Sequence, residues 1–311
     1  GVVIGVMRLS KNWLVAKVMT LYIELFRNIP VLLWIIIVFS IMIETMPMPR
    51  DFRSGEASMM LYDSMAITNR GVYVPEPLFS RSLGDWNLFG TSSLRFGISL
   101  DLLVILFTLF SGMFVSKRIK QKADKIQNET GIRPTTWWKR LSIILVPVLI
   151  VLWVLGFYLG YPELKGFNFK GGMVIRPEFI AMFLALTIYT AAFISETVRS
   201  GILSVTKGQR EASASLGLKK SWIMRLIIIP QALRVIVPPL TSQYLNLTKN
   251  SSLGIAVGYA DLVHGFGGIS LNQTGQAIEC MVIVMATYLT ISLTISAFMN
   301  IYNRSIQFKE K

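Results

Sequence analysis

The stretch GQREASASLG, residues 208–217, followed by an apolar run that ends at Pro230, is the most informative part of this sequence. Four small residues, 212–215, lie between charged residues on both sides. Small side chains let a helix backbone settle closely into a groove on another protein. The stretch therefore predicts a short helix that docks on a partner, although an ordinary connector helix at a membrane surface would share much of this pattern.

Signals at both ends limit this helix to little more than two turns. Thr206 followed three residues later by Gln209 is typical of a capping box, in which both side chains satisfy backbone N–H groups. Gly217 suits the left-handed conformation that ends a helix. Glu211 near the start and Lys219 after the end both complement the helix dipole. A helix this short is not stable alone in water, so it must be held at both ends or by a partner.

The composition places the chain in a membrane. Of its 311 residues 53% are hydrophobic and only 15% are charged, and the mean hydropathy is +0.55. Crossing a bilayer takes about 20 apolar residues in a helix. We therefore expect an all-α, polytopic membrane helix bundle. The predicted spans lie at about residues 29–43, 93–115, 141–160, 177–198, from 226 onward with interruptions at Pro230, Pro238 and Pro239, and 276–301.

Two segments do not fit a complete span. Residues 1–10 resemble the last turns of a span that meets a basic loop, which suggests an N-terminally truncated fragment. Residues 247–276 contain too many glycines for a clean span, and we expect a short helix there, on the outer side or re-entrant.

The formal charge of +14 indicates how the chain is oriented in the membrane and does not indicate a nucleic-acid site. Lys and Arg lie in short segments between apolar runs, not on one amphipathic face interleaved with aromatic residues. Basic segments of this kind stay in the cytoplasm. This rule places residues 117–140, residues 199–230 and the C-terminus inside, and the mixed-charge segment 45–95 outside.

Metal and cofactor chemistry has little support in this sequence. Cys280 is the single cysteine and His264 the single histidine, which excludes an internal disulfide and a Cys/His metal site. A lone histidine also argues against a haem-carrying electron-transfer subunit. The sequence has no G-x-x-x-x-G-K-[ST] phosphate loop. We expect no catalytic residue, metal or cofactor in this chain.

The docking stretch resembles the signature of a known family. Glu211-Ala212, Gly217 six positions after the glutamate, and Ile227 with Pro230 resemble the EAA signature of ABC importer permeases, with Ser213 in place of the third alanine. Ile229 replaces the leucine of that signature.

Other parts of the chain extend the resemblance to the polar amino-acid uptake permeases. Residues 189–201 resemble the span that precedes the signature in that family, and residues 26–30 and 247–253 also match it. The long external segment and extra hairpin between these regions resemble the general L-amino-acid permease branch.

The resemblance implies a fold and a set of partners. The fold would be a type I (MetI-like) ABC importer transmembrane domain with a cytoplasmic coupling helix, in the bacterial inner membrane. ATP and Mg would be bound by a separate ATP-binding cassette ATPase subunit, so the chain itself would not be an enzyme. A second permease subunit, homologous or identical, and a periplasmic amino-acid-binding protein would complete an importer of L-amino acids.

This resemblance also divides the chain. Residues 1–45 would be the N-terminal part of the permease core, and 46–177 an insertion with a periplasmic loop and an extra transmembrane hairpin. Residues 178–305 would be the C-terminal core with the coupling loop at 199–230, and 306–311 a cytoplasmic tail.

Candidate site residues fall into two groups. The residues assigned to the ATPase-coupling loop are Gly208, Gln209, Arg210, Glu211, Ala212, Ser213, Leu216, Gly217 and Pro230. Those assigned to a translocation path or gate are Glu196, Arg199, Asn246, Lys249, Asn250 and Ser251.

Each path residue also has a simpler interpretation. Glu196 and Arg199 are three residues apart and can pair on one helix face, as a structural salt bridge or as a gate. Lys249 lies 19 residues after Pro230, in the outer half of the membrane if the helix is straight. It would contact a substrate carboxylate there, or reach the headgroups as a snorkelling lysine.

The alternative function is an ion-coupled secondary transporter of small polar solutes. Such a carrier needs buried acids near mid-span and two related halves. Asp101 is the one reasonable candidate acid, since Glu279 lies near the outer end of its span, and no matching halves are visible.

Overall fold

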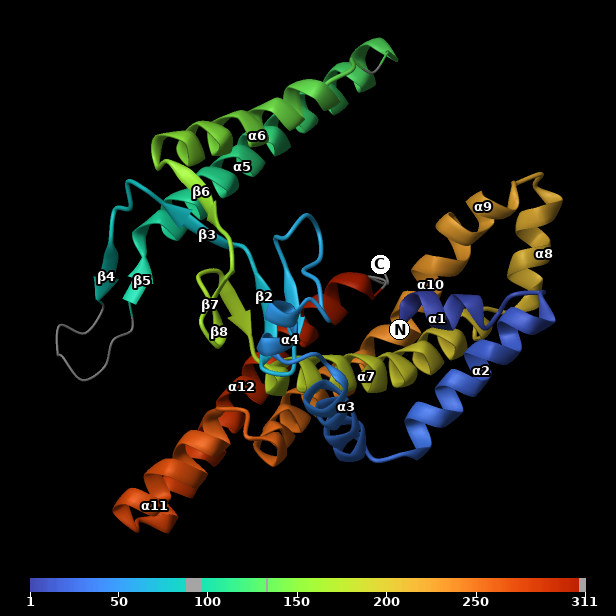
Figure 1. Ribbon diagram of the computed structural model, residues 1–311. Helices are drawn as coiled ribbons and strands as arrows, with labels where there is room; N and C mark the ends of the chain where they lie inside the picture. The colour runs from blue at the N-terminus through green and yellow to red at the C-terminus, as the bar shows by residue number, and fades with distance from the viewer. Residues whose placement is uncertain (88–96, 133, 308–311) are drawn as a thin grey trace. The chain divides into compact units, whose positions relative to one another are not determined.

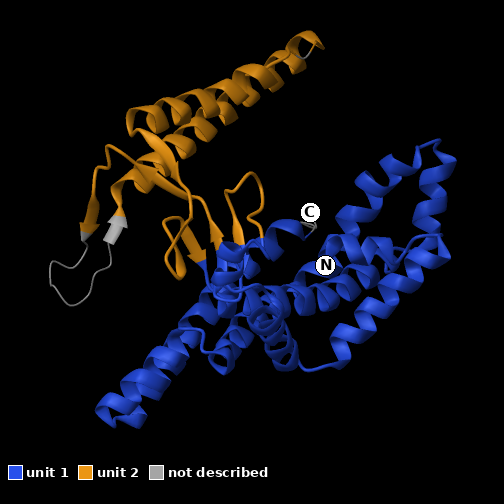
Figure 2. Ribbon diagram, viewed as in Figure 1, with its two compact units in different colours: residues 1–57, 67–72, 175–311 blue, residues 58–66, 73–174 orange. Residues whose placement is uncertain are grey.

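A computed structural model describes residues 1–87, 97–132 and 134–307, most of them in helices (Figure 1). Within these residues, six helices are long and apolar enough to cross a membrane, which confirms the predicted helical membrane bundle. The chain divides into two compact units, coloured separately in Figure 2. Unit 1 comprises residues 1–57, 67–72 and 175–311, and unit 2 comprises residues 58–66 and 73–174.

Unit 1 is built around one long helix, α7 (Pro177–Leu203). Its other helices up to the coupling loop are α1 (Val2–Met7), α2 (Trp13–Asn28), α3 (Val31–Thr45), α4 (Pro49–Ser54) and α8 (Lys207–Ser215). After the loop come α9 (Lys220–Ile223), the π-helix η1 (Met224–Ile228), α10 (Ile229–Asn250), the 3₁₀ helix η2 (Ser251–Val257), the π-helix η3 (Val263–Ser270), α11 (Leu271–Thr274) and α12 (Ala277–Ile306).

Small residues bring the neighbours of α7 close to it, and α1, α2, α3 and α10 all pack on this helix. A Cβ added at Gly5 of α1 would lie 2.5 Å from the carbonyl oxygen of Ser195, so only glycine permits this approach. On α3, the fully buried Ile35 packs with Ala185 of α7 and Val257 of η2. The short side chains of α7 therefore make it the centre of the unit.

Unit 2 combines a long helical hairpin with short strands. Helices α5 (Leu100–Thr130) and α6 (Trp137–Val154) form the hairpin, and a Cβ at Gly112 would lie 3.0 Å from the carbonyl oxygen of Ile143. Three antiparallel pairs accompany it: β3 (Glu76–Phe79) with β6 (Phe157–Gly160), β4 (Asp85–Asn87) with β5 (Gly97–Ser99), and β7 (Glu163–Lys165) with β8 (Asn168–Lys170). The strands β1 (Ala66–Thr68), β2 (Gly71–Val74) and β9 (Met173–Ile175) lie where the chain passes between the units.

The hairpin differs from its prediction in both helices. Helix α5 runs to Thr130, through basic residues that were expected to form a loop, and stops at Gly131 with φ +72°. Lys and Gln are good helix formers, so the helix continues beyond its apolar part. Helix α6 begins at Trp137 and ends at Val154, and residues 157–160 form a strand instead of the last turn of a span. Part of the predicted start of the second span, residues 93–96, lies outside the described residues.

The fifth predicted span is a continuous helical segment from Lys220 to Val257. Pro230 has no N–H, so the carbonyl of Leu226 loses its usual partner four residues ahead. The helix has a π-helical turn at residues 224–228, directly before this proline. Pro238 and Pro239 lie inside α10. The glycine-rich segment 247–276, where one short helix was expected, contains η2, which continues the fifth span to Val257, and then η3 and α11.

Candidate functional site

The coupling loop contains the short helix that the sequence predicted. Helix α8 has nine residues, Lys207–Ser215. Gly217 has φ +73°, and its N–H donates a hydrogen bond of 2.9 Å to the carbonyl of Ala214. The predicted capping box is wrong: Thr206 occupies the N-cap position, but its side chain makes no capping hydrogen bond. The first turn of α8 is thus held by something other than its own cap.

An apolar cluster and one arginine hold α8 at both ends. Val205 before the helix and Ile223 after it are buried in one cluster with residues of α7, η1 and α10. The complete buried set is Val198, Ile202, Val205, Ile223, Ile228, Ala232 and Ile236. In addition, Arg210 Nη2 donates a hydrogen bond of 2.7 Å to the carbonyl of Ile202 on α7. The segments on both sides of α8 are therefore packed in the same buried cluster as α7 and α10.

One face of α8 and its C-cap residue are exposed. Gln209, Glu211 and Ala212 are exposed, and Leu216 is 80% exposed. A leucine in this position exposes apolar surface that a partner can bury. Ser213, also assigned to the coupling loop, is buried and donates a hydrogen bond of 2.6 Å to the carbonyl of Gln209. Pro230 is half-buried at the start of α10 and lies outside α8.

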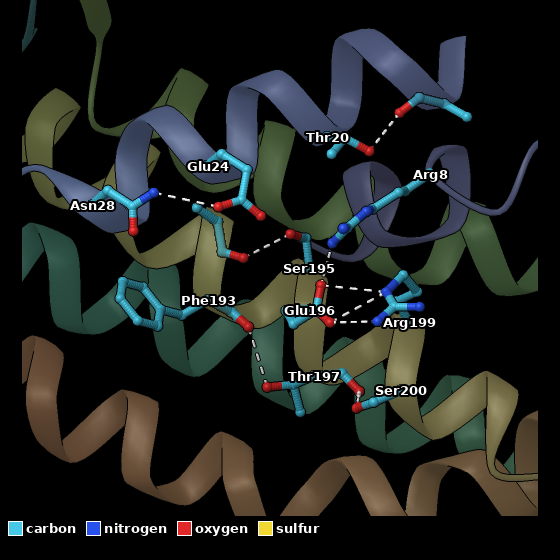
Figure 3. A network of polar contacts seen from close by, with 12 residues as sticks. Arg8, Thr20, Glu24, Asn28, Phe193, Ser195, Glu196, Thr197, Arg199 and Ser200 are labelled. Atoms are coloured by element: carbon cyan, nitrogen blue, oxygen red, sulfur yellow. Dashed lines mark hydrogen bonds and ion pairs between the residues drawn. The ribbon is translucent and has the colours of Figure 1, made fainter. Parts of the chain in front are cut away.

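A charged group joins α7 to the end of α1, about three helical turns before α8. Glu196 Oε1 accepts a hydrogen bond of 2.6 Å from Arg199 Nη2, which confirms the predicted pair. Figure 3 shows that Glu196 also pairs with Arg8, the residue that follows α1. All three side chains are partly buried. The part played by Arg8 was not predicted, because a contact between residues 188 positions apart has no local signal in the sequence.

A polar cavity of about 250 Å³ lies between α7 and α10. Its lining comes from one face of each helix, namely Tyr189, Thr190, Phe193, Gln243, Asn246, Leu247 and Asn250. Gln243, Asn246 and Asn250 are spaced three and four residues apart, so their amides share one helix face. The guanidinium carbon of Arg27 on α2 lies 5.3 Å from the centre of the Phe193 ring. The cavity is therefore lined by amide and hydroxyl groups, with a cation beside one wall.

Only part of the predicted path is brought together by this cavity. Asn246 and Asn250 line it, but Lys249 lines a different hollow with Ser252, Val263, Val284 and Tyr288. Ser251 donates a hydrogen bond of 2.7 Å to the carbonyl of Thr248 and does not line the cavity either. Glu196 and Arg199 lie further along α7 than the cavity-lining residues. The helical spacing of Gln243, Asn246 and Asn250 in the sequence could have predicted that they line one cavity.

The two acids considered for a carrier, Asp101 and Glu279, are hydrogen-bonded and exposed, respectively. Asp101 lies in the first turn of α5, where it accepts hydrogen bonds of 2.6 Å from Ser82 Oγ and 2.9 Å from the Leu83 N–H. Glu279 is exposed in the first turn of α12. Within the described residues, no group of three or more His, Cys, Asp or Glu side chains could hold a metal ion.

Comparisons with known proteins identify the family. The profile of the "Binding-protein-dependent transport system inner membrane component" family matches residues 133–308. The permease protein BztB of the glutamate/glutamine/aspartate/asparagine transport system of Rhodobacter capsulatus is 51% identical over 98% of this chain and 73% of that protein. The general L-amino acid transport system permease protein AapQ of Rhizobium johnstonii is 44% identical over the whole chain and 72% of that protein. The chain belongs to the inner membrane components of binding-protein-dependent transport systems and is a multi-pass membrane permease.

Proposed function

We propose that this permease imports L-amino acids by coupling ATP hydrolysis on a separate cassette ATPase to alternating access in the membrane. The observation that carries this proposal is α8: its outer face is exposed, and both of its ends are fixed in the core of unit 1. A partner that moves α8 would move α7 and α10 with it, because these elements share one buried cluster. ATP and Mg would be bound by that partner, with this chain supplying the docking helix.

The proposed orientation has α8 and the C-terminus in the cytoplasm. The coupling loop itself is basic and contains Arg199, Lys207, Arg210, Lys219, Lys220 and Arg225. Such residues resist transfer across the membrane during insertion, which favours the inner side. A periplasmic amino-acid-binding protein would then deliver the substrate on the opposite side. A second permease, identical or homologous, would complete the path.

The proposed substrates are polar L-amino acids. Two supports favour them: the named substrates of the relatives BztB and AapQ, and the amide and hydroxyl groups that line the cavity between α7 and α10. Arg27, stacked on the cavity-lining Phe193, is a better candidate partner for a substrate carboxylate than Lys249, which lines another hollow. Hydrogen-bonding groups in such a site discriminate strongly against ligands that leave them unpaired.

The coupling proposal is tested by Leu216→Asp in proteoliposomes that contain the permease, its cassette ATPase and its binding protein. Leu216 is 80% exposed, so the change alters the docking face and leaves the core intact. We expect amino-acid uptake and its ATP hydrolysis to fall at least about tenfold, because burying an unpaired carboxylate opposes docking. Phe167→Asp, at a residue 83% exposed in the β7–β8 turn, is the control and should leave both rates unchanged. Equal rates in the two variants would refute the proposed role of α8.

A further inference from the structure

The hairpin of unit 2 changes from apolar to basic at the same level on both of its helices. On α5 the apolar run ends at Val115, and Lys117 begins the basic part. On α6, Lys139 and Arg140 precede the apolar run. Arg140 Nε donates a hydrogen bond of 3.2 Å to Ser116 Oγ. This bond links the two helices at the positions where each changes from apolar to basic. Such a change from apolar to basic residues, with a tryptophan (Trp137) beside it, is typical of the boundary between the hydrocarbon and the headgroups of a bilayer.

Two hollows meet at this level. One, of about 320 Å³, is lined by Pro134, Thr135, Thr136, Trp137 and Arg140. The other, of about 260 Å³, is lined by Ser116, Trp137, Arg140, Leu141 and Ile144. They share Trp137 and Arg140. The first hollow presents hydroxyl groups and a guanidinium, and the second continues along aliphatic side chains. Together they match a lipid, which has a polar headgroup and apolar acyl chains.

The guanidinium of Arg140 has no carboxylate partner among the described residues. Its Nε donates a hydrogen bond to Ser116. The segment 117–140 around it has eight Lys or Arg residues and two acids. A half-buried guanidinium in so basic a setting favours a phosphate ester, which it binds through charge-assisted hydrogen bonds.

We propose that these hollows bind one anionic phospholipid of the surrounding bilayer. Its phosphate would lie against Arg140 and the hydroxyls of Thr135 and Thr136, and its first acyl carbons would lie along Leu141 and Ile144. The surplus of basic residues explains why an anionic headgroup is favoured over a zwitterionic one, whose added cation is repelled. The lipid would fix the hairpin at the membrane surface, a role separate from docking of the ATPase or passage of the substrate.

The test is native mass spectrometry of the full chain, purified in mild detergent with added phosphatidylglycerol or, separately, phosphatidylcholine. We expect one phosphatidylglycerol to be retained, with apparent affinity at least about tenfold above that for phosphatidylcholine. Arg140→Gln should abolish this preference. The control Lys125→Gln removes the same charge from an exposed position on α5 and should change the affinity less than about twofold. Equal losses in the two variants, or no preference in the unaltered protein, would overturn the proposal.

Two further measurements distinguish lipid binding from misfolding of the variant and from binding of free phosphate. Arg140→Lys keeps the charge and should retain most of the phosphatidylglycerol preference, so a loss of binding in Arg140→Lys that equals the loss in Arg140→Gln would contradict a charge-based site. Inorganic phosphate in excess should not displace the lipid, because it lacks the acyl chains that contact Leu141 and Ile144. Displacement by inorganic phosphate would show a general phosphate site and refute lipid binding.

Discussion

Glu196 of α7 pairs with both Arg199, one turn further along the same helix, and Arg8, the residue that follows α1. The side chain of Arg8 is 18% exposed and that of Glu196 is 27% exposed, so water screens this pair only partly. The carboxylate therefore links the N-terminal helix to the central helix of unit 1. It also compensates two guanidinium groups, which would otherwise repel each other.

The first prediction concerns the strength of this link. In a double-mutant cycle of Arg8→Gln and Glu196→Gln, we expect a coupling free energy of about 1–2 kcal/mol, measured from unfolding of the purified protein in detergent. The pair Arg50–Asp51, in which the arginine side chain is 75% exposed and the N–O distance is 3.5 Å, is the control and should couple by less than about 0.5 kcal/mol. A coupling for Arg8–Glu196 no larger than that of the control would show that the link is only superficial.

The second prediction compares two glycines at opposite ends of α8. Gly217→Ala places a side chain at φ +73° and should destabilise the end of the helix by about 1 kcal/mol. Gly208→Ala lies inside the helix, has no atom within 4 Å of its added Cβ, and should be neutral or slightly stabilising. Uptake and ATP hydrolysis should therefore fall in the first variant alone. A loss of activity in Gly208→Ala that equals the loss in Gly217→Ala would contradict this account.

The third prediction concerns the close approach of α7 and α10. A Cβ at Gly201 would lie 2.3 Å from Ile236 Cγ1 and 3.2 Å from the carbonyl oxygen of Ala232. Gly201→Ala should therefore lower the free energy of unfolding by about 1–3 kcal/mol, and Ile236→Ala in the same chain should recover part of that loss. The control Gly265→Ala meets nothing within 4 Å. Simple addition of the Gly201 and Ile236 effects would show that the two residues do not share this contact.

The fourth prediction concerns the polar cavity. Asn246→Leu removes one amide from its lining and should raise the half-saturating substrate concentration for uptake about tenfold, because a polar group of the bound amino acid loses its partner. Lys249→Met, three residues further on and outside the cavity, is the control and should have little effect. If the lysine variant lost more uptake than the asparagine variant, the path would run through the other hollow.

Local features of the sequence were enough to predict the six spans, with errors in their bounds, and the short helix α8. Pro177 begins α7 where a proline at the first turn favours a helix start, and Gly217 has the left-handed conformation expected of a helix end. Residues 88–96, 133 and 308–311, which include most of the predicted tail, lie outside the described residues. The division into core and insertion stays a prediction, although the predicted insertion 46–177 encloses unit 2.

The remaining features depend on contacts that the sequence does not display. The capping box at Thr206 and Gln209 was wrong, because Arg210 and the cluster around Val205 hold α8 instead. The strands of unit 2 are three or four residues long, too short for a clear alternation of apolar and polar residues. Long-range pairs such as Arg8 with Glu196 are formed only by the packing of helices.

Site-specific photocrosslinking tests the central claim, that α8 docks on a cassette ATPase, most directly. Cys280 is replaced by serine, and a single cysteine is introduced by Ala212→Cys or by Ser213→Cys, each labelled with benzophenone maleimide in the assembled importer. Ala212 is exposed on α8, whereas the neighbouring Ser213 is buried against its own chain. We predict a crosslink to the ATPase from position 212 and little or none from position 213. Absence of the crosslink at 212, or equal crosslinking at both positions, would contradict the claim.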